Sequence, residues 1–203
     1  SKCSPVISNT YLPRRYKIYL NLVFKKFPKF YITKDFITLK KSDIKLRNNL
    51  TNKFYFKQYN WVQDSVNLLI FEMLPVEFLE AFHDLINETK KMKWPLSPKF
   101  IFTSNNFDTD EIFKCYTALS IENGTKYFVG QHGSTYGSHR FEYLTIEEIT
   151  SDKFFTWGWK EDQSIHHSGF SFFNLRKKII LKLNLKNITL ISQNLGTNVE
   201  FYD

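Results

Sequence analysis

Apolar residues recur at helical spacing between residues 59 and 93. Before Pro75 the recurring positions are Val66, Leu69, Ile70, Met73 and Leu74. After Pro75 they are Phe78, Leu79, Phe82, Leu85 and Ile86. This spacing predicts one amphipathic helix on each side of the proline, because Pro either breaks a helix or begins a new one. We expect both apolar stripes to be buried in the core.

The most regular pattern follows, between residues 99 and 130. Residues 99–104 (KFIFTS) read as a strand, 105–107 as a loop and 126–130 (KYFVG) as a second strand. Between them, Asp108 and Glu111 suggest a capping box that starts a helix, and Gly124 ends it. Strand, helix and strand within about 30 residues are typical of a βαβ unit with parallel strands. The buried stripe of the helix is expected to be Ile112, Cys115, Tyr116 and Leu119.

Less regular segments flank this unit. Residues 152–159 (DKFFTWGW) read as a third strand, on which Trp157 and Trp159 would share a face. A Lys-rich helix or linker at 176–186 and a strand at 187–194 follow, and residues 1–57 suggest short strands or helices. The predicted fold class is therefore α/β, a Rossmann-like parallel sheet with flanking helices.

Two loops of this predicted sheet carry candidate chemistry. Asn105 and Asn106 follow the first strand of the unit, and the segment Gln131-His132-Gly133 follows the second. In open parallel sheets, ligands bind beyond the carboxyl ends of the strands. Glycines let the backbone approach a ligand closely, and exposed N–H groups in such a turn can receive a phosphate or carboxylate.

His132 is the side chain in this loop that can exchange a proton near neutral pH. Spacing alone leaves two interpretations open, a general base and a structural hydrogen-bonding histidine. The other histidines are His83, His139, His166 and His167, and none has metal-ligand spacing, so we predict no metal site. Walker A, G-x-G-x-x-G and G-x-S-x-G motifs do not occur in the sequence.

The charge is distributed unevenly. The net charge is +8, and residues 1–57 hold 14 Lys and Arg against 2 Asp and Glu. Such a basic segment suits an anionic membrane surface, nucleic acid or an acidic polymer, whereas codon drift in an AT-rich genome would give the same excess of Lys without a function. The sequence contains no apolar run long enough to span a membrane. Cys3 and Cys115 could pair, although two reduced thiols fit a cytoplasmic protein better.

Three motifs together resemble a known family. They are the segment SNNFDTDEIFK at 104–114, GQHGSTYG at 130–137 and DKFFTWGW at 152–159. They resemble a family of transferases from bacterial surface-carbohydrate loci, first catalogued from spirochaetes, and the resemblance covers roughly residues 59–160. Ser134 stands where the family pattern has Gly.

The resemblance implies a fold and a division of the chain. Family members look like two-domain glycosyltransferases of the GT-B type, with two facing Rossmann-like halves. By this resemblance, 1–57 is a basic partial N-terminal domain, 58–169 the acceptor-side core, and 170–203 a linker with the start of the donor-side domain. The chain would then be the middle of a larger transferase that works in the cytoplasm or on the inner face of the membrane, without a cofactor of its own. By itself it is expected to be inactive, because most of the donor-side half is missing.

The same resemblance implies roles for individual residues. By analogy with teichoic-acid glycerophosphotransferases, His132 would deprotonate an acceptor hydroxyl and Gln131 would orient the acceptor or the ring. The remaining predicted site residues would bind substrate: Gly133 and Ser134 through their N–H groups, Tyr136 by stacking on a sugar, and Asn106 and Asp108 from the neighbouring loop.

The expected partners are a nucleotide-sugar donor and a glycan or lipid-linked acceptor. Two other functions remain open from the sequence. One is a non-catalytic module that binds an anionic glycan or nucleic acid, although no nucleic-acid-reading motif occurs in the chain. The other is a phosphotransferase that builds a polyol-phosphate polymer.

Overall fold

The computed structural model describes residues 4–25, 29–54, 61–133, 136, 144–162 and 164–169. The predicted Lys-rich segment 176–186 and strand 187–194 lie outside these residues, as does Ser134. The described part is an α/β fold with a five-stranded sheet, all of whose strand pairs are parallel, in the order β1-β2-β3-β4-β5. The predicted Rossmann-like fold class is therefore confirmed.

After residue 100, helices separate β2, β3 and β4, and β5 follows β4 directly. The strands are β1 (Val6–Ile7), β2 (Phe100–Thr103), β3 (Lys126–Gly130), β4 (Lys153–Thr156) and β5 (His166–Ser168). The helices are α1 (Arg14–Val23), α2 (Ile44–Phe54), α3 (Trp61–Met73), the 3-10 helix η1 (Val76–Phe78), α4 (Phe82–Lys91), α5 (Asn106–Thr109), α6 (Glu111–Glu122) and α7 (Ile146–Thr150). No helix in this part of the chain is both long and apolar enough to cross a membrane.

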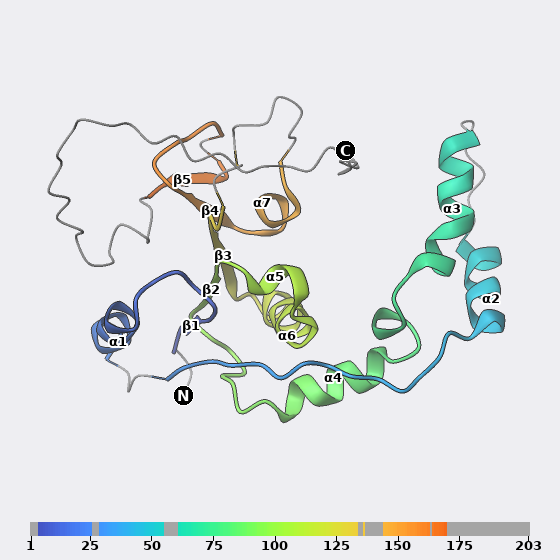
Figure 1. Ribbon diagram of the computed structural model, residues 1–203, viewed down its shortest axis with the longest axis horizontal. Helices are drawn as coiled ribbons and strands as arrows, with labels where there is room; N and C mark the ends of the chain where they lie inside the picture. Colours follow the sequence, from blue (N-terminus) through green and yellow to red (C-terminus); the bar gives the residue numbers. More distant parts are fainter. Residues whose placement is uncertain are drawn as a thin grey trace, which may run out of the picture.

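Side-chain alternation along the strands gives the sheet two different apolar faces. Ile101, Val129 and Phe154 point to the face that α6 covers, where they join the main buried cluster. Phe102 and Phe128 point to the opposite face, on which α1 lies (Figure 1). Both faces of the sheet are therefore apolar, as expected for parallel strands that have helices on both sides.

Gly130 ends β3 at a point where neighbouring side chains lie close to its backbone. A methyl group added there would lie 2.9 Å from the tip of the Phe102 ring and 3.2 Å from the Ser104 hydroxyl oxygen. We expect Gly130→Ala to lower the free energy of unfolding by about 1–3 kcal/mol, because the ring must shift to admit the methyl. Chemical denaturation measures this cost. The cost should shrink in a Phe102→Leu background, and an equal cost in both backgrounds would contradict the explanation.

The helix between β2 and β3 starts later than predicted. Residues Asn106–Thr109 form the separate short helix α5, and Asp110 rather than Asp108 caps α6, accepting a hydrogen bond from the Phe113 N–H at 2.8 Å. The predicted capping role of Asp108 is wrong because α5 already contains this residue. The stop at Gly124 is confirmed, with a positive φ of 83°. The predicted stripe is buried except for Leu119, which is exposed.

The strand predicted over 152–159 is shorter in the structure. β4 ends at Thr156, and Gly158 has a φ of 111° that turns the chain away from the sheet. Trp157 and Trp159 therefore do not share a strand face, and that prediction is wrong. β5, which the sequence analysis did not predict, pairs with β4 as the edge strand.

The helical stripe of α3 is not in the core. Val66, Leu69, Ile70 and Met73 are 46% to 76% exposed. The α2–α3 hairpin lies apart from the sheet (Figure 1), so α3 packs against α2 instead. After Pro75, which precedes η1 as its N-cap, Phe78 and Phe82 are also exposed, whereas Leu85 on α4 is fully buried. The prediction of two buried stripes is therefore wrong for α3 and only partly right for α4.

One buried ion pair fixes the hairpin to the rest of the chain. Arg47 on α2 binds Glu80, before α4, with two hydrogen bonds of 2.7 Å. Its third nitrogen donates to the carbonyl oxygens of Phe71, Glu72 and Leu74 at 2.8–2.9 Å. These carbonyls lie at the C-terminal end of α3, where helix carbonyls lack partners within the helix. Arg47 therefore joins α2, α3 and the start of α4.

The basic segment 1–57 contributes to the fold. Its described part supplies the edge strand β1 and the helices α1 and α2, which agrees with the prediction of short strands and helices. The division of the chain into domains at residues 57 and 169 stays a prediction. Cys115 is buried on α6, and Cys3 lies outside the described residues, so their predicted redox state also stays a prediction.

Candidate active site

The two loops predicted to carry chemistry lie at the same edge of the sheet. His132 follows the carboxyl end of β3, and α5 follows the carboxyl end of β2. Since β2 and β3 are parallel neighbours, their carboxyl ends are adjacent. The Phe107 ring on α5 lies 5.5 Å from the His132 ring, centroid to centroid, and so connects the two loops. The predicted placement of both loops is confirmed.

A buried carboxylate stands behind His132. The Nε2 atom of His132 lies 3.8 Å from Oε1 of Glu147 on α7, and the Tyr136 hydroxyl donates a hydrogen bond to the same oxygen. The Glu147 side chain is 7% exposed, whereas that of His132 is 35% exposed. His132 can therefore meet a ligand from solvent while its other side faces a fixed carboxylate. A base oriented by an acid of this kind is a common element of catalytic sites.

Glu147 is held in its charged form. Burial alone would raise the pKa of its carboxyl, but contacts with the His132 ring and the Tyr136 hydroxyl outweigh burial, and the pKa lies below its usual value. An ionised carboxylate next to an imidazole stabilises the imidazolium that forms when the ring accepts a proton. Because Nε2 faces Glu147, Nδ1 is the ring nitrogen left to accept that proton.

Gln131 connects the histidine loop to the Thr-Trp-Gly-Trp segment. Its Oε1 atom accepts hydrogen bonds from the Trp157 backbone N–H at 2.7 Å and the Trp159 indole N–H at 2.8 Å. Its Nε2 atom donates to the Gly133 carbonyl oxygen at 2.7 Å. The residue is 3% exposed. Gln131 thus positions the loop, which explains physically why the two motifs occur together. Its predicted contact with an acceptor stays a prediction.

The remaining predicted residues take different places. Tyr136 is buried, and its ring contacts His132 at 5.3 Å and Phe154 at 5.1 Å, so little of its face is open for stacking on a sugar. Asn106 is buried and lines a separate cavity beside α5. Asp108 is exposed on α5. The structure therefore brings together His132, Gly133 and Tyr136, whereas Asn106, on α5, lines the separate cavity.

The acidic residues of α7 are not among the site residues predicted from the sequence. Glu148 accepts hydrogen bonds from the Thr145 N–H and hydroxyl at 2.6 and 2.8 Å in a capping box, and contacts Nε2 of His166 at 2.8 Å. The capping box could have been read from Thr145-x-x-Glu148, which would have placed the helix. No local signal marks Glu147 as the partner of His132, because that contact depends on how α7 packs against the sheet.

Metal ligands are not grouped in the part of the chain that the structure describes. No set of three or more His, Cys, Asp or Glu side chains there is arranged to hold a metal ion. His132, with Glu147 beside it, offers proton transfer.

Comparison with known proteins adds one finding. A family model described as "LIC12162 family transferase" matches residues 2–199, which is nearly the whole chain and extends well beyond the 59–160 resemblance. No curated protein and no solved structure matches the chain.

Proposed function

Because the chain belongs to the LIC12162 family of transferases, we propose that it moves a sugar from a nucleotide-activated donor to an acceptor hydroxyl in the synthesis of a bacterial surface polysaccharide. The observation that carries the proposal is the accessible His132 in front of the buried, ionised Glu147 at the carboxyl edge of the sheet. The sugar and the polysaccharide come from the resemblance of the sequence motifs. The proposed architecture is of the GT-B type, with this sheet on the acceptor side.

The proposed step is a displacement at the anomeric carbon of the donor. Nδ1 of His132 takes the proton of the acceptor hydroxyl while its oxygen forms the new bond to the sugar. The bond between the anomeric carbon and the phosphate oxygen breaks, and the nucleotide leaves with the electron pair. The imidazolium formed faces Glu147, whose negative charge stabilises it. Backbone N–H groups at 133 and 134 are proposed to hold an anionic group of a substrate.

A thermal-shift screen tests the donor class. The full-length protein is incubated with CMP-, UDP-, GDP- and CDP-linked sugars, and we expect one nucleotide family to raise the melting midpoint because a ligand that binds only the folded state stabilises it. His132→Gln should keep the shift, since the base is not proposed to hold the nucleotide. No shift with any donor, together with binding to polyanions that weakens steeply with salt, would instead support a non-catalytic binding module.

We further propose that the protein contacts the inner face of an anionic membrane through its basic N-terminal segment. The segment 37–43 and helix α2 expose Ile37, Leu39 and Ile44 to solvent, and Lys41 and Lys45 lie exposed between or beside them. Apolar side chains that enter a headgroup region and lysines that meet anionic lipids are the two components of interfacial binding.

This contact makes a measurable prediction. Lys41→Gln combined with Lys45→Gln should weaken binding to vesicles of phosphatidylglycerol and phosphatidylcholine by roughly 30-fold, since each lysine near the surface contributes about 1 kcal/mol. Co-sedimentation measures the bound fraction. Lys90→Gln combined with Lys91→Gln on α4 is the charge-matched control, and it should bind as the wild type does. An equal loss in both pairs of variants would show that only net charge matters, against a specific contact.

A further inference from the structure

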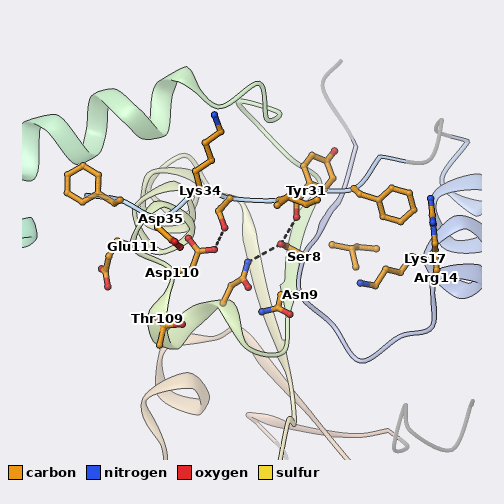
Figure 2. A pocket seen from close by; sticks show the side chains of 16 residues that line it. Ser8, Asn9, Arg14, Lys17, Tyr31, Lys34, Asp35, Thr109, Asp110 and Glu111 are labelled. Carbon is orange, nitrogen blue, oxygen red and sulfur yellow. Dashed lines mark hydrogen bonds between the residues drawn. The ribbon is translucent and has the colours of Figure 1, made fainter. Parts of the chain in front are cut away.

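A second cavity lies at the carboxyl end of β1 and is separate from the His132 loop. It has a volume of about 880 Å³, is open to solvent on one side, and is lined by the loop after β1, the start of α1, the strap at residues 30–36 and the α5–α6 junction (Figure 2). A volume of this size accommodates a small ligand. His132, Gly133 and Tyr136 are not among the residues that line it.

One end of the cavity is cationic. Arg14 and Lys17 both line it from α1 and are three residues apart, so they lie on the same face of the helix (Figure 2). The Arg14 guanidinium lies over the Phe30 ring, 5.1 Å from its centroid, which leaves the edge of the guanidinium free to donate hydrogen bonds. Burial lowers the pKa of Lys17.

These two cations have no anionic partner in the described part of the chain. The ion pairs found there involve other lysines, Arg47 and two histidines. A cation that is partly withdrawn from water without a counter-charge costs free energy. An anion bound between Arg14 and Lys17 would offset that cost for the half-buried Lys17 and would pair with the exposed Arg14.

The middle of the cavity offers hydrogen-bonding groups on a rigid support. The Asn106 amide donates to the Ser8 hydroxyl at 2.9 Å, and that hydroxyl donates to the Tyr31 carbonyl oxygen at 2.9 Å. These bonds fix Asn106, whose Oδ1 accepts no hydrogen bond from the described residues. That oxygen can therefore accept a hydrogen bond from a ligand hydroxyl.

The opposite end of the cavity is acidic. Asp110 is occupied there, since its two oxygens accept hydrogen bonds from the Phe113 N–H and the Thr33 hydroxyl, and burial raises its pKa. Glu111 binds Lys114 through Oε1 at 2.8 Å, and its buried Oε2 atom has no partner among the described residues. This end thus suits a donor group such as a hydroxyl and disfavours a second anion.

From this arrangement we infer that the cavity binds a phosphorylated polyhydroxyl compound, such as a sugar phosphate. Its phosphate lies between Arg14 and Lys17, and its hydroxyls point toward Asn106 and Glu111. The phosphate group would pair with the cations at one end of the cavity, and the hydroxyl groups would donate to the hydrogen-bond acceptors at the other end. A ligand with only one of these two kinds of group would leave one end of the cavity without a partner. Phe107 on α5, next to Asn106, contacts His132. The ligand would lie at the carboxyl end of β1, two strands from β3 and His132.

Isothermal titration calorimetry with glucose 1-phosphate tests the assignment. Arg14→Gln combined with Lys17→Gln should weaken binding by about 10- to 100-fold, because charge-assisted hydrogen bonds to the phosphate are lost. The matched control is Arg15→Gln, which removes a positive charge from the same turn of α1 but does not line the cavity; it should bind within about twofold of the wild type. Wild-type affinity should also fall with ionic strength.

Three comparison ligands identify what is recognised. Glucose and inorganic phosphate should each bind at least tenfold more weakly than glucose 1-phosphate, since each uses one end of the cavity. Tighter binding of uridine monophosphate than of glucose 1-phosphate would overturn the sugar-phosphate assignment in favour of a nucleotide. Unchanged affinity in the Arg14 and Lys17 double variant, or no wild-type binding, would overturn the site itself. The His132→Gln variant should bind glucose 1-phosphate as the wild type does. Loss of turnover in that variant would therefore test the proposed base and not the cavity, so the two proposals can fail independently.

Discussion

Replacing His132 with Gln is expected to lower turnover by about 10²- to 10⁴-fold, which is the usual contribution of a general base. Glutamine fills a similar volume but cannot accept the proton of the acceptor hydroxyl. The fold should survive, because the His132 side chain is partly exposed and its contacts are with Phe107, Tyr136 and Glu147. Steady-state rates with the donor identified in the binding screen measure the effect, and the melting midpoint verifies folding.

Two further variants separate catalysis from structure at this site. His83→Gln changes an exposed histidine on α4, away from the sheet edge, and should leave turnover unchanged. Glu147→Gln should lower turnover less than His132→Gln does, because Glu147 positions the ring and stabilises its charged form without touching the acceptor. Turnover of His132→Gln equal to that of the wild type would end the general-base assignment.

Replacing Arg47 with Met is expected to destabilise the protein by about 3–5 kcal/mol, as breaking one side of a buried ion pair usually does. The Arg47 and Glu80 side chains are 7% and 6% exposed. Methionine leaves the Glu80 carboxylate without its cation, and it leaves three carbonyl oxygens at the end of α3 without their shared donor. Chemical denaturation measures the change in the free energy of unfolding.

An exposed ion pair provides the control for this stability effect. Lys91 pairs with Glu88 on α4, where both side chains are largely in water, and Lys91→Met should cost less than about 1 kcal/mol. A similar cost for Arg47→Met and Lys91→Met would contradict the structural role given to Arg47.

The same pair gives a pH dependence with a definite sign. Hydrogen bonds from Arg47 lower the pKa of Glu80 to about 2, against an ordinary value of 4.5. A carboxyl whose pKa is depressed in the folded state stabilises that state at pH values above its ordinary pKa, and this stability is lost as pH falls toward the folded value. The cost of Arg47→Met should therefore be largest above about pH 4.5 and shrink between about pH 4.5 and 2.

The βαβ unit could be predicted because its signals are local. Short apolar strands, a glycine stop and a helical stripe all lie within about 30 residues, and β3 has the bounds that the sequence suggested. The placement of His132 followed from the same unit, since the carboxyl ends of parallel strands share one edge. The start of α6 was harder to predict, because Asp108 and Asp110 both precede it and only the formation of α5 selects Asp110.

Other features depend on contacts that sequence spacing does not contain. The stripe on α3 correctly indicates a helix, but spacing cannot say that its partner is α2 rather than the sheet. Glu147 comes close to His132 only because α7 packs next to β4. The cavity beside α5 combines side chains from α1, the strap and α6, which are separated by up to about 100 residues. Such sites need the tertiary fold before their chemistry can be recognised.

The most direct test of the central claim is the mass of the product formed from donor and acceptor. The full-length protein is incubated with the nucleotide-sugar donor that the thermal screen selects and with a glycan acceptor, and the acceptor is analysed by mass spectrometry. The proposed function predicts an increase by one sugar residue without phosphorus, which is lost in His132→Gln. An increase that contains a phosphate would show a polyol-phosphate transferase, and an unchanged acceptor mass under conditions of donor binding would contradict sugar transfer.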